Sequence, residues 1–545
     1  MKTSLRTPAL YAALILILAL PSGRLQSQRP IVPDTATAGE ERVSEVMRLI
    51  DGNYVEGPDM ERMSTEAINA MLKALDPHSM YIAAKDVERA NEGLQGNFEG
   101  VGISFQIVND TIVVQSVIDG GPSEKVGVEV GDKLISIDGI PATGDSIDNK
   151  FVFDHLRGKK GTTVIVDVMR QHEVYNFHIV RDKVPIYSID TYFMADDSIG
   201  YIRLIRFART SVDEFHKALK DLTKQGMTSL ILDLRGNSGG YLDIAYGLAN
   251  EFLDRGQLVV YQEGRRTPRQ DFRANGRGQW RATRDAQGNI TSGKLVVLID
   301  EGSASASEIV SGAVQDWDRG MLIGRRSFGK GLVQRMFQLK DGGQIRLTTA
   351  RYYTPSGRCI QRPYDQGGDA YRQDVNNRYK NGELVNADSI HFADSLRYQT
   401  AHGRTVYGGG GIMPDIFVPI DTTRLSDYFI SVRGKGLMNT FPMQWADAHR
   451  KQPSVKTFDK FMQNYDSFGL DSLLAAAALE KGVVRDTAKE ALDPQRTAHS
   501  NAYMSMMLKA QVARNLFGAD YYYKVMKDAD DGFQKALEVL RERKQ

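Results

Sequence analysis

The spacing of apolar residues divides the chain into stretches with different predicted structures. Between residues 198 and about 354, continuous apolar runs at 230–234 and 295–299 are typical of buried strands, and 211–225 and 242–253 have the spacing of amphipathic helices. Strands that alternate with helices predict a mostly parallel sheet covered by helices. Ligand sites in such sheets lie beyond the carboxyl ends of the strands, so we expect the turns after these two strands to face one crevice.

The stretches on either side of this region have other patterns. Residues 43–54 and 64–75 have helical spacing, whereas the chain from 96 to about 184 consists of short strand-like runs, glycine turns and two short helical segments. From residue 425 to the end the pattern is largely helical. We therefore expect a multidomain α/β protein with a helical region at each end.

The first residues have the pattern of a targeting segment. Lys2 and Arg6 precede a largely apolar run at 9–20. This run has the length of a signal-peptide core and is short for a membrane span, which needs about 20 apolar residues. We expect residues 1–27 to be a signal peptide and the protein to be exported to the cell envelope, in the periplasm or at the inner membrane. Retention of the uncleaved segment, with membrane association, is the alternative.

Composition excludes several classes of function. The formal net charge of +1 provides no basic field for nucleic acid, so no nucleic-acid partner is expected. Cys359 is the only cysteine, which rules out an intrachain disulfide. The sequence has no His-Glu-x-x-His motif and no paired Cys-x-x-Cys motifs, so neither a metal nor another cofactor is expected. A chain of 545 residues is also too long for a single hydrophobic core.

Two short stretches carry the clearest chemical signal. Residues 302–308, Gly-Ser-Ala-Ser-Ala-Ser-Glu, follow an apolar run and open a helical segment, and residues 328–334, Phe-Gly-Lys-Gly-Leu-Val-Gln, place a lysine between glycines. A serine on a turn between a strand and a helix is accessible, and the N-terminus of the helix offers free N–H groups to an oxyanion. We interpret the pair as a serine nucleophile and a lysine base. The alternatives are a helix N-cap at Ser303 and a solvated loop tip at Lys330.

Together with other segments, these stretches resemble the carboxy-terminal processing proteases, also called tail-specific proteases. The resemblance covers roughly residues 40–420. Its further motifs stand in the family's order at 75–79 (Leu-Asp-Pro-His-Ser), 100–103 (Gly-Val-Gly-Ile), 232–240 (Leu-Asp-Leu-Arg-Gly-Asn-Ser-Gly-Gly), 353–358 (Tyr-Thr-Pro-Ser-Gly-Arg) and 410–415 (Gly-Gly-Ile-Met-Pro-Asp). Cys359 and Ser238 depart from the residues usual in the family, and an insertion at about 364–406 separates segments that usually lie close together.

The resemblance implies a fold and a division of the chain. It implies a PDZ domain at 92–182, inserted before a protease core of the ClpP/crotonase type at 183–420. The rest of the chain then forms a linker and N-terminal helical region at 28–91 and a helical C-terminal extension at 421–545. Homo-oligomerisation through the helices of this extension is an open hypothesis.

The resemblance also implies Ser305 as the nucleophile, Lys330 as the general base and Gln334 as the residue that orients the lysine. A lysine acts as a base only when it is neutral, so burial must lower its pKa from the ordinary value of about 10.4. Gln334 can contact the amine without adding a charge, whereas an acidic side chain there would keep the lysine protonated.

Backbone N–H groups form the other candidate sites. For an oxyanion, the donors are the amide of Ala306, directly after the nucleophile, and an amide of Gly239 or Gly240, since glycine lets a substrate approach closely. For a peptide terminus, a loop before a strand edge can bind the terminal carboxylate while the peptide adds as an extra strand. The residues of that loop are Gly100, Val101, Gly102 and Ile103. The apolar residues of the strand favour polypeptides with apolar C-termini as partners.

The first functional hypothesis is therefore an exported serine endopeptidase that recognises polypeptide C-termini and cleaves peptide bonds through an acyl-enzyme on Ser305. The second is a PDZ scaffold or chaperone with a silent protease core, against which the intact Ser305, Lys330 and Gln334 argue. The third is a crotonase-type enzyme that acts on thioesters, against which the signal segment and the PDZ module argue.

Overall fold

The computed structural model describes residues 37–284 and 290–542. The predicted signal peptide at 1–27 lies outside these residues. Within the described ranges, no helix combines the length and the apolar character that crossing a membrane requires.

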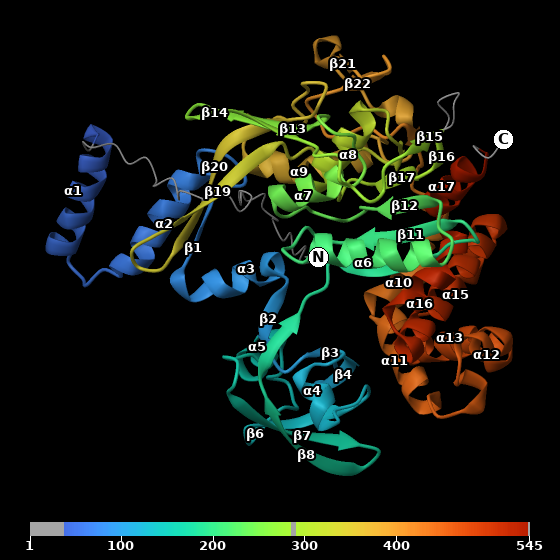
Figure 1. The fold of residues 1–545 in the computed structure, drawn as a ribbon. Coiled ribbons are helices and arrows are strands. Elements are labelled where there is room, and N and C mark those ends of the chain that lie inside the picture. The colour runs from blue at the N-terminus through green and yellow to red at the C-terminus, as the bar shows by residue number, and fades with distance from the viewer. Residues whose placement is uncertain (1–36, 285–289, 543–545) are drawn as a thin grey trace.

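A central sheet forms the middle of the molecule, in the strand order β10-β11-β12-β17-β18-β23 (Figure 1). β10 is antiparallel to β11, and the other neighbours are parallel, as the alternating pattern predicts. The strands are β10 (Ile189–Met194), β11 (Ile199–Leu204), β12 (Ser229–Asp233), β17 (Lys294–Ile299), β18 (Met321–Gly324) and β23 (Ile416–Phe417).

Both faces of the central sheet are covered, which explains the continuous apolar run of β12. Leu230 and Leu232 lie in the core formed with α6 (Ser211–Lys224), α7 (Leu242–Asn250) and α8 (Ala306–Asp316). Ile231 points to the opposite face and contacts the cluster that contains Phe533 and Leu540 of α17 (Asp531–Glu542). The last helix of the chain therefore belongs with the central sheet, although the sequence pattern groups it with the rest of 421–545.

A second, antiparallel sheet lies beside the first and carries the lysine region. β20 pairs with β1, β13 and β19, and β13 pairs with β14. Through β1 this sheet also fixes the N-terminal segment 75–79 next to the core. The strands are β1 (Met80–Ile82), β13 (Leu258–Gly264), β14 (Thr267–Arg273), β19 (Leu332–Gln338) and β20 (Gln344–Tyr353). β15 (Thr283–Arg284) pairs with β16 (Ile290–Ser292).

Helices precede the two sheets along the chain. They are α1 (Ala38–Asn53), α2 (Met60–Lys73) and α3 (Val87–Gln95). α2 begins earlier than the apolar spacing predicts, because Asp59 caps it by accepting a hydrogen bond from the Arg62 amide at 2.9 Å. α1 stands apart from the other elements in Figure 1 and has no buried residue.

A strand-rich module follows α3 and lies below the core in Figure 1. β2 (Asn97–Gly100) and β9 (Asp182–Pro185) pair at its entry and exit. Its sheet has the order β3-β4-β5-β7-β8, so β3 has a free edge, and β6 pairs with β5. Its strands and helices are β3 (Ile103–Val108), β4 (Thr111–Val117), β5 (Lys133–Ile137), β6 (Ile140–Pro141), β7 (Thr163–Arg170), β8 (Glu173–Val180), α4 (Pro122–Val126) and α5 (Asn149–Leu156).

The predicted insertion contains ordered structure. It holds α9 (Gly368–Lys380), in which Tyr371 and Arg378 are buried, and the hairpin of β21 (Arg397–Gln399) and β22 (Thr405–Tyr407). The low apolar content of this stretch hides the helix, because the residues that dock it are mostly polar.

The C-terminal extension is a helical bundle with a core of its own, which contains Phe429, Trp445, Phe461 and Leu508. Its helices are α10 (Asp427–Gly434), α11 (Leu437–His449), α12 (Phe458–Asn464), α13 (Leu470–Glu480), α14 (Thr487–Glu490), α15 (Pro494–Phe517) and α16 (Ala519–Met526). The predicted helical content of this region is thus confirmed.

Candidate active site

Ser305 occupies a sharp turn between β17 and α8. Its backbone has φ of 59° and ψ of −111°, a conformation that side-chain-bearing residues adopt only under strain of about 1–3 kcal/mol. The residue is fully buried, and within the described chain its Oγ makes no hydrogen bond. A buried hydroxyl that forms no structural bond remains available for chemistry.

The neighbouring serines have structural roles. Ser303 Oγ donates to the carbonyl of Leu234 at 2.8 Å, and Ser307 Oγ donates to the carbonyl of Asn237 at 2.7 Å. Ser303 is therefore not the helix N-cap that the sequence left open, because α8 begins at Ala306 and Ser305 takes the N-cap position. Both hydroxyls attach the Ser305 turn to the loop after β12.

Lys330 lies in a buried loop directly before β19. Its Nζ is 3.4 Å from Oε1 of Gln334, and Gln334 Nε2 donates to the carbonyl of His78 at 2.6 Å. The His78 carbonyl fixes the orientation of the amide, so that the oxygen of Gln334 faces the lysine. The solvated loop tip considered from the sequence is excluded, because only 2% of Lys330 is exposed.

Burial lowers the pKa of Lys330 from 10.5 to about 7. The nearby carboxylates of Asp76 and Glu308 act in the opposite direction, and the guanidinium of Arg346 adds to the lowering. A substantial fraction of the amine is therefore neutral near pH 7, which is the condition for a base.

Glu308 joins the serine turn to the lysine loop. Its buried carboxylate accepts from the amides of Ser305 (2.7 Å), Gly329 (2.7 Å) and Lys330 (2.9 Å), and from Ser327 Oγ (2.5 Å). Burial raises the pKa of Glu308, and these hydrogen bonds oppose the rise. Sequence reasoning quoted Glu308 as part of the serine motif and gave it no role. Its position three residues after Ser305, within the first turn of a helix, was the available signal.

The candidate oxyanion donors lie beside Ser305 but differ in their present contacts. The Gly239 amide donates to Oδ1 of Asn237 at 2.9 Å, whereas the amides of Ala306 and Gly240 have no partner within the described residues. Gly239 has φ of +103°, and a Cβ there would lie 2.8 Å from Ser305 Cβ, so only glycine fits. Ala306 and Gly240 are thus the donors that this arrangement leaves available.

Comparison with known proteins gives the family. Residues 198–366 match Peptidase family S41, and residues 100–180 match the PDZ domain. A carboxy-terminal-processing protease of Bartonella bacilliformis is 36% identical over 327 residues, which is 59% of this chain and 72% of that protein. The chain belongs to the S41 family of carboxy-terminal-processing serine peptidases. The strand-rich module is its PDZ domain.

Two further proteins are similar to this peptidase. A probable CtpA-like serine protease of Staphylococcus aureus is 32% identical over 328 residues, which is 60% of this chain and 63% of that protein. The solved structure of a photosystem II D1 C-terminal processing protease is 25% identical and covers 70% of this chain and 94% of that chain, with a TM-score of 0.35. Residues 428–518 match a family of unknown function, DUF8443.

The PDZ domain of the peptidase has the geometry of a peptide-binding edge. The loop Gly100–Ile103 leads into the free edge of β3, and the amides of Val101 and Gly102 have no partner in the described chain. Val101 is buried, and Ile103 and Phe105 pack against the same cluster. Phe105 also contacts Phe153 of α5, with ring centroids 5.8 Å apart. The predicted loop residues therefore lie together at the start of β3, an edge strand of the sheet, and Phe105 of this strand packs against α5.

Helix α9 of the insertion covers the lysine loop of the peptidase. Arg378 donates to the carbonyls of Ser327 (2.8 Å) and Phe328 (3.2 Å), and Tyr371 Oη is 3.0 Å from His78 Nε2. Burial, followed by the charges of Lys330 and Arg362, lowers the pKa of His78 to about 2. His78 is therefore neutral at physiological pH and contributes its carbonyl to the site. The sequence offered no signal for this cover, since it depends on contacts between distant segments.

Proposed function

We propose that this peptidase is a serine endopeptidase in which Ser305 is the nucleophile, Lys330 is the general base and Gln334 orients the base. The observation that carries the proposal is the buried Lys330, whose pKa is lowered to about 7 and whose Nζ is 3.4 Å from an uncharged acceptor. The Glu308 carboxylate ties this loop to the Ser305 turn.

The reaction would proceed by acyl transfer. Neutral Lys330 takes the proton of Ser305 as Oγ attacks the peptide carbonyl, and the amides of Ala306 and Gly240 donate to the oxyanion. The protonated lysine then gives its proton to the leaving amine, and water hydrolyses the acyl-enzyme with the lysine again as base. Because Ser305 Oγ makes no hydrogen bond within the described residues, it must approach Lys330 Nζ when substrate binds.

We further propose that the PDZ domain selects polypeptides by their free, apolar C-termini. The loop amides of Val101 and Gly102 suit a terminal carboxylate, and the free edge of β3 suits an added strand. Tethering the tail raises the local concentration of the chain at the active site. Export to the cell envelope belongs to the same proposal and rests on the sequence of residues 1–27.

The experiment compares one reporter protein with an apolar tail, a charged tail and an amidated apolar tail. Wild-type enzyme should cleave the free apolar tail fastest, and Ser305→Ala should cleave none of the reporters. Ser311→Ala is the matched control, because its buried hydroxyl donates only to the carbonyl of Ser307 within α8, at 2.7 Å. Equal rates for the three tails would refute tail recognition.

A substitution on β3 separates the role of the PDZ domain from that of the catalytic site. Phe105→Ala should remove the preference for apolar tails and leave cleavage of a short unstructured peptide unchanged. Val174→Ala is the control, since Val174 is 61% exposed on β8 at the opposite edge of the same sheet. The silent-scaffold alternative predicts tail binding without cleavage of any reporter.

A further inference from the structure

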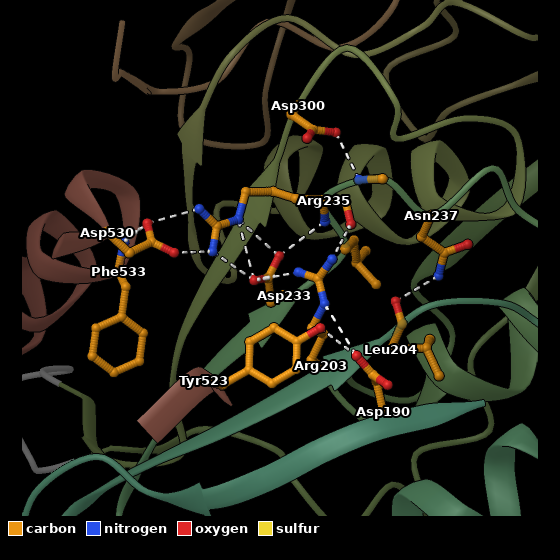
Figure 2. A network of polar contacts seen from close by, with 12 residues as sticks. Asp190, Arg203, Leu204, Asp233, Arg235, Asn237, Asp300, Tyr523, Asp530 and Phe533 are labelled. Carbon is orange, nitrogen blue, oxygen red and sulfur yellow. Dashed lines mark hydrogen bonds and ion pairs between the residues drawn. The ribbon is translucent and has the colours of Figure 1, made fainter. Parts of the chain in front are cut away.

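A buried ion network connects the loop beside Ser305 to the C-terminal segment (Figure 2). Its centre is Asp233, fully buried at the end of β12. The Asp233 carboxylate accepts from Tyr201 Oη (2.6 Å), Arg203 Nη1 (2.9 Å) and Arg235 Nη2 (2.7 Å). Burial alone would raise the pKa of Asp233, but the guanidinium groups of Arg235 and Arg203 outweigh it and hold the pKa well below the ordinary value.

Arg235 shares this carboxylate with Arg203 and has another partner from the end of the chain. Asp530, between η7 (Lys527–Ala529) and α17, accepts from Arg235 Nη1 at 2.8 Å and from Nη2 at 2.7 Å. This two-point pairing is the strong geometry for a guanidinium and a carboxylate. Asp530 also accepts from the Phe533 amide at 3.0 Å, so the same side chain stabilises the first turn of α17.

Arg235 begins the loop that leads to Gly240, one of the two available oxyanion donors. Its amide donates to Asp233 Oδ1 at 2.9 Å, and its carbonyl accepts from Arg203 Nη2 at 3.2 Å. The next residue, Gly236, donates to Asp300 at 2.8 Å, and the loop then reaches Gly240. The position of Arg235 therefore sets the start of a short segment whose other end faces Ser305.

No other acid of the described chain pairs with the Nη1 of Arg235. Arg235 and Asp530 line a cavity of about 610 Å³ between the central sheet and the helical bundle. The next acid along the chain, Asp531, pairs with Arg424 at 2.6 Å. Without the Asp530 charge, Asp233 would be the one remaining ion-pair partner of Arg235 among the described residues. Arg203 pairs with the same Asp233 carboxylate.

We propose that Asp530 is a positioning residue for catalysis, and that the C-terminal segment completes the oxyanion loop from outside the peptidase core. The proposal rests on the proposed function, because it assigns the loop a role in acyl transfer. An oxyanion donor acts mainly in the transition state, so a displaced loop lowers kcat and leaves KM nearly unchanged.

The test is Asp530→Asn, which keeps the side-chain shape and an oxygen for the Phe533 amide but removes the charge. Loss of one oxyanion donor lowers kcat by about 10²–10³-fold. A displaced donor should cost less, so we expect kcat of Asp530→Asn to fall about tenfold and its KM to stay within about twofold of the wild-type value. Asp530→Glu should recover part of the loss. The matched control is Asp528→Asn, because Asp528 is exposed in the same segment and has no ion pair within the described residues.

Hydrogen exchange gives a readout that does not depend on activity. Backbone amides of residues 236–241 should exchange faster in Asp530→Asn than in Asp528→Asn. Unchanged exchange and unchanged kcat in Asp530→Asn would overturn the inference while leaving the proposed function intact. An inactive wild-type enzyme would instead refute the proposed function, and the exchange comparison would still decide whether Asp530 holds the loop.

A second variant separates positioning from general loosening of the C-terminal segment. Tyr523 Oη donates to Asp190, and Arg203 lies 5.3 Å from the Tyr523 ring centroid. Tyr523→Phe weakens docking of this segment and leaves the Arg235–Asp530 pair in place. It should lower the melting temperature without lowering kcat. An equal fall of kcat in Tyr523→Phe and Asp530→Asn, at equal losses of stability, would overturn the positioning role.

Discussion

Replacing Gln334 with glutamate places a negative charge beside Lys330 with little change of shape. Gln334 Oε1 is 3.4 Å from Lys330 Nζ, and both side chains are buried. Opposite unit charges at this distance attract by about 5 kcal/mol at an effective dielectric constant of about 20. Since about 1.4 kcal/mol corresponds to one pKa unit, the pKa of Lys330 should rise by about 3.5 units from its value of about 7.

The change predicts a shifted pH–rate profile. The neutral amine is the base, so wild-type kcat/KM should rise with pH around the Lys330 pKa of about 7 and level off above it. In Gln334→Glu the rise should move to about pH 10.5, and the rate at pH 8 should fall by about 300-fold. The assay is the initial rate of cleavage of a fluorogenic peptide across this pH range.

Gln334→Met is the control for loss of the amide without a new charge. It removes the hydrogen bond to the His78 carbonyl and should lower the rate at every pH without moving the midpoint. A Gln334→Glu enzyme with the wild-type profile would refute the argument that Lys330 must be neutral to act.

Other predictions concern residues that hold the site together. Glu308→Gln should lower kcat by about 100-fold or more, because one carboxylate positions both turns. Glu214→Gln should cost stability alone, because it weakens the hydrogen bonds that this α6 side chain accepts from the amides of Ser188 and Ile189. Normal kcat in Glu308→Gln would contradict the bridging role. Tyr371→Phe should lower the free energy of unfolding by about 1 kcal/mol in urea titrations, since it removes the contact with His78. The exposed Tyr379 on the same helix is its control, and equal losses from both substitutions would argue against a specific contact.

Local patterns predicted the parts of the fold that local contacts determine. The apolar run 230–234 identified a strand buried on both faces, because Leu230 and Ile231 contact opposite cores. The serine turn and the glycine-flanked lysine were also recognisable, since the chemistry requires those residue types at those places. Gln334 was predicted to contact the lysine, and the structure places its oxygen 3.4 Å from Nζ.

Contacts between distant segments could not be predicted in the same way. The side chain of Asn237 accepts a hydrogen bond from the Gly239 amide. This contact depends on a side-chain conformation that no sequence spacing reveals. The polar helix α9 gave no apolar signal, because it docks through residues such as Arg378. Helix α17 was predicted to be helical, but its contact with the central sheet was not, although Phe533, Leu537 and Leu540 recur at helical spacing within a strongly charged stretch.

The most direct test of the account is the site at which an acyl-enzyme forms. A peptide reaction quenched in acid and mapped by mass spectrometry should show the acyl group on Ser305, and neither on Ser303 nor on Ser307. The rate of its formation should rise with pH around the Lys330 pKa of about 7 and should be lost in Lys330→Ala. An acyl group on another serine, or formation at the wild-type rate without Lys330, would contradict the account.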